Sequence, residues 1–148
     1  MRNRVVAALL VVAILAGAGV GYLVGSQKEI AMKTISCPSA TTEEYSPSGF
    51  RVEVSYQGPW NATISTYSAF ATTPAYLLST CHYGGNGTAY VYVASPNPNG
   101  EQTVLGAAHK LDSSGGNLTV TVTYGAASRS NSTTSPYGSA ETFVSTAP

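Results

Sequence analysis

The chain has 148 residues with seven basic and seven acidic side chains, so its formal net charge at pH 7 is zero. Only Arg2 and Arg4 among the basic residues precede the long apolar stretch, and the faintly acidic remainder offers no basic patch, which excludes nucleic-acid binding. Charged residues make up 9% of the chain, against about a quarter of an ordinary soluble domain, which favours an extracellular surface of hydroxyls, amides and tyrosines.

Residues 5–25 contain no charged side chain and are long enough, as a helix, to cross the roughly 30 Å of a bilayer's hydrocarbon. Because Arg2 and Arg4 lie just before this stretch, the positive-inside rule places the N-terminus in the cytoplasm and the rest of the chain outside the cell. We therefore expect residues 1–26 to be a single-pass anchor in the membrane lipid bilayer. The alternative is a secretory signal cleaved near 16–18, which would release the domain.

Small residues recur at every fourth position of the apolar stretch, and on a helix they form one flat stripe. Such a stripe lets a second helix approach closely, so it predicts a protein partner in the membrane or self-association. The alternative is that glycine is simply common in membrane helices. The stripe consists of Ala13, Gly17, Gly21 and Gly25.

Residues 27–48 show no sustained period and are rich in proline, serine and threonine, so we expect a stalk. Cys37 in this stalk and Cys81 beyond it are an even pair outside the membrane, which predicts one disulfide formed in an oxidising compartment. The closed loop would contribute about 3 to 5 kcal/mol. The alternative is free thiols or metal ligands, but His82 and His109 leave a metal site short of ligands.

The predicted folded domain occupies residues 49–148. Alternating apolar and polar residues predict strands over 50–56 and 60–64, joined as an antiparallel hairpin across Gly58-Pro59, with Trp60 in the core. Further strands are expected over 76–81, 89–94, 103–111, 118–124 and 140–144, with turns at 84–87 and 95–100 and a polar hairpin turn at 112–116. About seven short strands without a helical period predict an all-β fold, an antiparallel immunoglobulin-like sandwich.

Four asparagines meet the N-glycosylation pattern without proline at the middle position. We expect each to be accessible to the modifying enzyme, because three fall at turns or strand ends and one on the polar face of a strand. The four are Asn61, Asn86, Asn117 and Asn131.

No catalytic pattern is present in the sequence. A serine hydrolase needs a nucleophile, a histidine and usually a carboxylate, but there is no G-x-S-x-G, and the sole aspartate, Asp112, lies in a predicted turn where it bonds its own backbone. Paired acids of the glycosidase type, phosphate-binding glycine loops and calcium loops are missing too. We therefore expect no enzyme and no cofactor.

Three segments resemble small, N-terminally anchored β-sandwich proteins of archaea and actinobacteria, of which the mycobacterial MmpS proteins are the named members. The segments are 52–60 (VEVSYQGPW), 109–120 (HKLDSSGGNLTV) and 135–138 (SPYG). The resemblance implies an accessory role beside a larger membrane protein, because MmpS proteins are associated with lipid-exporting transporters. Cys37 and the tyrosine-rich middle of the chain do not match that group, so the partner is not carried over.

The leading functional hypothesis is a non-enzymatic, membrane-anchored surface domain that acts by protein contact, as a subunit of a membrane complex or surface layer. A second is a secreted filament subunit whose freed arm, 19–48, adds a strand to a neighbour's sheet. A third is a binding module for carbohydrates or small ligands. Its stacking surfaces would be Tyr67, Tyr76, Tyr83, Tyr90 and Tyr92.

Overall fold

The computed structural model describes residues 36–45, 48–70, 73–95 and 101–146. The chain divides into two compact units, 1–34 and 35–148, and every described residue belongs to the second. The predicted membrane segment, with Ala13, Gly17, Gly21 and Gly25, lies outside the described residues. Among the residues that are described, no helix is long and apolar enough to cross a membrane.

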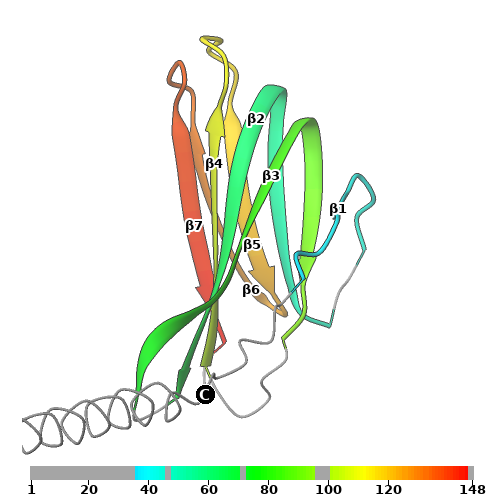
Figure 1. Ribbon diagram of the computed structural model, residues 1–148. Helices are drawn as coiled ribbons and strands as arrows, with labels where there is room; N and C mark the ends of the chain where they lie inside the picture. Colours follow the sequence, from blue (N-terminus) through cyan, green and yellow to red (C-terminus); the bar gives the residue numbers. More distant parts are fainter. Residues whose placement is uncertain (1–35, 46–47, 71–72, 96–100, 147–148) are drawn as a thin grey trace, which may run out of the picture. The chain divides into compact units, whose positions relative to one another are not determined.

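The described domain is an all-β, antiparallel sheet of seven strands (Figure 1). The number agrees with the prediction, and in the described ranges there is no helix. The strands are β1 (Ala40–Thr41), β2 (Phe50–Phe70), β3 (Thr73–Val93), β4 (Glu101–Lys110), β5 (Leu118–Tyr124), β6 (Ala127–Thr133) and β7 (Ser139–Ser145).

Strands β2 and β3 are 21 residues each, far longer than an ordinary strand of about six, and they pair along their whole length. The first part of β2 also pairs with β5, whereas its second part pairs with β4. Strand β6 then pairs with β5, and β7 pairs with β4. The β2–β3 hairpin therefore belongs to two groups of strands, β5–β6 at one end and β4–β7 at the other.

The predicted hairpin turn at Gly58-Pro59 is wrong, because β2 continues through it with a β-bulge. The register with β3 shifts between Tyr56 and Pro59, while the alternation of side chains stays in phase, with Tyr56 and Trp60 buried and the intermediate Gly58 between them. Pro59 cannot donate to the ladder, and a side chain at Gly58 would lie 2.4 Å from an Asp112 carboxylate oxygen. Both residues fit a bend in one strand.

The glycines expected to form a turn at 84–87 also lie inside a strand. They form the part of β3 opposite the bulge, where Asn86 pairs with Pro59 and Gly85 with Trp60. A side chain at Gly85 would lie 2.7 Å from the Trp60 ring, whose Nε1 donates to the Gly87 carbonyl at 2.9 Å. Gly85 is therefore needed for close packing of the indole, which is 2% exposed as predicted for a core residue.

The core lies between the two strand groups, and Figure 1 shows β5 and β6 behind β4 and β7. The two groups approach closely at Gly106 on β4, since a Cβ there would lie 2.9 Å from Val52 and 3.1 Å from Val120. The core consists of Phe50, Val52, Val54, Tyr56, Trp60, Ala62, Ile64, Val91, Val104, Ala108, Leu118, Val120, Val122, Ala140 and Val144.

Several other sequence predictions have a clear outcome. The strands over 118–124 and 140–144 are confirmed as β5 and β7, and the pattern over 103–111 as β4. The segment 112–116 is a polar loop, but not a hairpin turn, because β4 and β5 do not pair with each other. Strand β6 was not predicted, since all its side chains except Thr133 are exposed and it contains no apolar residue larger than alanine.

Candidate functional site

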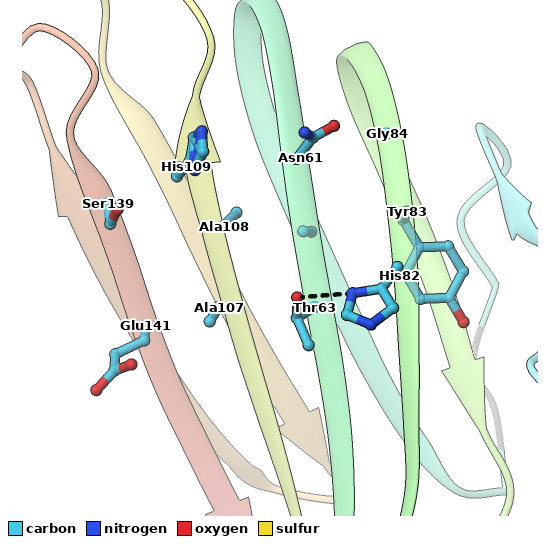
Figure 2. Close-up of a pocket in the computed structure, with 11 residues that line it drawn as sticks. Asn61, Thr63, His82, Tyr83, Gly84, Ala107, Ala108, His109, Ser139 and Glu141 are labelled. Atoms are coloured by element: carbon cyan, nitrogen blue, oxygen red, sulfur yellow. Dashed lines mark hydrogen bonds between the residues drawn. The ribbon is translucent and has the colours of Figure 1, made fainter.

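A groove of about 640 Å³ crosses the outward face of strands β3, β2, β4 and β7 (Figure 2). It exists because small residues, including Ala107 and Gly84, lie between larger polar side chains on this face. The strand registers set its outward side chains in two rows across the sheet. In strand order from β3 to β7 the rows are Gly84, Asn61, His109 and Ser139, and then His82, Thr63, Ala107 and Glu141.

The groove offers hydrogen-bonding groups of mixed kind and little charge. Thr63 Oγ1 lies 3.2 Å from His82 Nδ1, and Figure 2 shows this pair on the β3 side. Among the described residues, the side chains of His109, Ser139 and Glu141 have no hydrogen-bond partner. Their free donors and acceptors suit a neutral ligand rich in hydroxyl groups.

This arrangement of side chains does not match the one that nucleophilic catalysis requires. A hydroxyl beside an imidazole needs a third group that orients the ring, and Glu141 lies three strand spacings from His82, or about 14 Å. In the described ranges no cluster of three or more His, Cys, Asp or Glu side chains could hold a metal ion. The outward side chains of the groove can donate and accept hydrogen bonds.

Asn61, a predicted glycosylation site, lies inside the groove. Its side chain is exposed on β2, with Gly84 of β3 on one side and His109 of β4 on the other. A Cβ at Gly84 would lie 3.1 Å from Asn61 Oδ1, so the amide oxygen is on the β3 side. The amide nitrogen faces β4, as Figure 2 shows.

The other three sequon asparagines are exposed but lie elsewhere. Asn86 is on β3 opposite the bulge, and Asn117 precedes β5, where its Nδ2 donates to Thr119 Oγ1 at 3.2 Å. Asn131 is on β6, and its Nδ2 donates to the backbone carbonyl of Glu141 on β7 at 3.0 Å. That bond bridges two strands that do not pair through their backbones.

The predicted disulfide between Cys37 and Cys81 is confirmed, with Cα atoms 5.6 Å apart. It joins the segment 36–45, expected to be a stalk, to β3. Tyr83 Oη also donates to the Pro38 carbonyl at 2.9 Å, and β1 pairs with β3 at Ala40 and Val91. The first residues of this segment are therefore bound to the domain. We call residues 37–45 the strap.

The far end of the strap is held by side chains. The Tyr45 ring stacks on Tyr92 with centroids 3.7 Å apart, and the Tyr45 amide donates to Tyr92 Oη at 2.8 Å. Tyr92 Oη donates in turn to the Glu43 carbonyl at 3.2 Å. Glu44 forms an ion pair with Arg51 on β2, the one salt bridge in the described part of the chain.

A buried lysine closes the end of the core near the bulge. Lys110 is 0% exposed, and its ammonium donates to the carbonyls of Ser114, Gly116 and Thr134 at 2.5, 2.8 and 3.3 Å. It also lies 5.1 Å from the centroid of the Tyr56 ring. A buried charge must be compensated in this way, and here backbone carbonyls provide the compensation.

Tyr56 connects this lysine to the 111–117 loop. Its hydroxyl donates to Asp112 and lies 2.6 Å from Ser114 Oγ, and the Ser114 amide donates to Asp112 Oδ1 at 3.2 Å, the local backbone bond predicted for that aspartate. Burial, followed by the hydrogen bond to Asp112, raises the pKa of Tyr56 above its ordinary value of 10.0. The cluster fixes the loop and stabilises the fold.

The four tyrosines suggested for ligand stacking whose side chains are described are not gathered on one surface. Tyr83 and Tyr92 contact the strap, Tyr67 is on the outer face near the far end of β2, and the side chain of Tyr76 lies outside the described set. Tyr90 packs beside Glu53, and burial and then this carboxylate raise its pKa.

No protein-family model, no curated protein and no solved structure matches the chain. The groove was missed in the sequence because its residues come from four strands whose registers only the fold supplies. Lys110 was missed because it is the last residue of β4. The signal in the sequence was weak: the alternation of the strand places this lysine at an inward-facing position.

Proposed function

We propose that this protein is a membrane-anchored domain that stands outside the cell and acts by protein contact, as an accessory subunit of a membrane complex or as part of a surface layer. The observation that carries the proposal is the strap. At Cys37, twelve residues beyond the end of the apolar segment at Gly25, the chain is bound to the domain by the Cys37–Cys81 disulfide. Such a bond persists in an oxidising compartment, which supports a location outside the cytosol.

The proposed anchor and its orientation are supported by the sequence alone. Residues 5–25 would cross the bilayer with the N-terminus in the cytoplasm, and the stripe ending at Gly25 would pack against a partner helix or a second copy. Release by signal cleavage is the alternative. The likeness to MmpS-type surface proteins points the same way and is part of the proposal.

The accessible faces of the domain suit contact rather than chemistry. On β5 and β6 the outward side chains are all hydroxyls, and Thr123 Oγ1 lies 3.0 Å from Ser128 Oγ. The groove lacks a proton relay, so we propose a non-enzymatic role. The outward hydroxyl residues are Thr119, Thr121, Thr123, Ser128, Ser130 and Ser132.

We further propose that the fold is an immunoglobulin-like sandwich whose two layers share the β2–β3 hairpin. Support comes from the core, where Gly106 of β4 packs against Val52 of β2 and Val120 of β5. Such contact between side chains of opposing strand groups is what two packed layers require.

The filament hypothesis gains no support from the described part of its arm. Residues 37–45 are bound to their own domain, so strand addition to a neighbour would first require reduction of the Cys37–Cys81 bond. The ligand hypothesis based on tyrosines loses its motivation, because these side chains are dispersed.

The proposal is tested by locating the domain and its N-terminus together. An affinity tag at the C-terminus should be labelled on intact cells, while N-terminal sequencing should recover Met1. Copurification in mild detergent should then recover a partner or a multimer. A cytosolic domain with reduced cysteines would contradict the proposal, and a mature chain starting near residue 19 would favour secretion.

A further inference from the structure

We propose that the groove is the seat of an oligosaccharide attached to Asn61 of the same chain. The inference rests on the proposed location outside the cytosol, where asparagine-linked sugars belong. It adds the occupant of the groove, which a contact function alone does not specify.

Asn61 differs from Asn117 and Asn131 in the state of its amide, and from Asn86 in its position. The Nδ2 atoms of Asn117 and Asn131 already donate to Thr119 and Glu141. Among the described residues, the Asn61 amide has no hydrogen-bond partner, and its nitrogen points toward β4 over the groove (Figure 2). Asn86 lies outside the groove lining. Of the four sequon asparagines, Asn61 is the one from which an attached sugar would begin inside the groove.

The covalent step is an ordinary glycosyl transfer. A polyprenyl-phosphate-linked oligosaccharide donates its first sugar, so the C1–O bond to phosphate breaks and a C1–Nδ2 bond to Asn61 forms. The amide proton leaves with the released lipid phosphate. No oxidant or reductant is needed, and Thr63 completes the required Asn-Ala-Thr pattern.

The groove next to Asn61 complements a sugar. Its neighbour across β4 is His109, followed by Ser139, and both side chains are exposed and unpaired among the described residues. Ala107 in the next row leaves room above the sheet, and Glu141 beyond it offers a carboxylate to hydroxyl donors. Sugar hydroxyls would thus meet imidazole, hydroxyl and carboxylate groups.

The same face continues toward the apolar side chains of Leu105 and Phe143, which are paired in the next row. Phe143 is 48% exposed, with Arg129 5.5 Å from its ring centroid. A second sugar lying here would remove apolar surface from water. The exposed phenylalanine is therefore accounted for by the same occupant.

Covalent attachment makes weak contacts sufficient. A tethered group has an effective concentration of the order of millimolar, so a few hydrogen bonds can keep it on the surface without tight binding. A free sugar would need far better complementarity, because it loses translational freedom on binding.

The test uses the full-length chain purified from its native host or from a host that glycosylates sequons. Mass spectrometry measures occupancy at each asparagine, and thermal unfolding is measured for His109→Ala and Glu141→Gln with and without Asn61→Gln. We expect each groove substitution to lower the Tm by about 4 °C when Asn61 is glycosylated and by less than about 1 °C when it is not. Asn117→Gln is the matched control, and the groove effects should survive it.

Occupied Asn61 with that coupling supports the proposal. Additive effects would overturn it, because the glycan would then project into solvent. A bare Asn61 beside occupied Asn86, Asn117 or Asn131 would also overturn it, as would saturable binding of a free oligosaccharide to the groove. If all four sequons carry no sugar in an oxidised surface protein, the glycan proposal is wrong and the proposed function still stands. A cytosolic chain with reduced cysteines would contradict both the glycan proposal and the proposed function.

Discussion

The disulfide allows a quantitative prediction about the unfolded state. Cys37 and Cys81 are 44 residues apart in the sequence, and for a closed loop of that size the chain-entropy model gives about 4 kcal/mol at 25 °C. Cys37→Ala should therefore lower the free energy of unfolding by about 4 kcal/mol. Because Cys37 is exposed and Cys81 is 4% exposed, this substitution breaks the cross-link but leaves the buried sulfur packed.

The measurement is equilibrium unfolding in urea followed by tryptophan fluorescence. Trp60 is the sole tryptophan of the chain and is 2% exposed, so its emission reports on the core of this domain. The midpoint should fall, and the slope with urea should rise because the unfolded chain without the cross-link exposes more surface. Reduction of the wild-type protein should reproduce both changes.

Two variants separate the cross-link from the contacts around it. Ser39→Ala changes an exposed neighbour of Cys37 and should leave the midpoint unchanged. Tyr83→Phe removes the hydrogen bond to the Pro38 carbonyl and should cost about 1 kcal/mol. A loss below about 1 kcal/mol for Cys37→Ala would refute the loop-entropy reasoning.

Three further predictions concern the interior. Lys110→Met should destabilise the domain by about 3 kcal/mol in the same urea assay, because three carbonyls lose their donor; a variant as stable as the wild type would show that water replaces the ammonium. Gly106→Val should lower the free energy of unfolding by about 1 to 3 kcal/mol, because the added side chain overpacks against Val52. A smaller loss would mean that the two strand groups separate easily. For Tyr56, the folded pKa lies above the unfolded value of 10.0, so its stabilisation is complete below pH 10 and is lost as the pH rises through the folded pKa. Wild type should therefore lose more stability than Tyr56→Phe between neutral and strongly alkaline pH, and parallel curves would contradict this assignment.

The fold class was predictable because burial on one face of a strand leaves an alternating pattern. Over β5 and β7 that pattern and the flanking turn residues agree, and both strands were found. At Gly58-Pro59 the local turn signal conflicts with the alternation, which stays in phase from Tyr56 to Trp60. The alternation was the better guide to the structure, because a bulge accommodates glycine and proline without reversing the chain.

The remaining features depend on contacts between distant residues. β6 has almost no buried face, so its residues carry no pattern, and it forms by pairing with β5. The strap was expected to be a stalk because the stack of Tyr45 on Tyr92 joins residues 47 positions apart. The groove likewise requires the registers of four strands. The cysteine pairing was predictable because two cysteines allow one pairing.

In an anchored chain, the strap determines where a mechanical load would enter the domain. For a pull applied between the N-terminal segment and the C-terminus, the covalent path runs from Cys37 directly to Cys81, so residues 38–80 lie outside that path and cannot be extended while the disulfide is intact. Reduction of that one bond would release about 150 Å of extensible chain. The disulfide thus limits how far the chain can be extended under load.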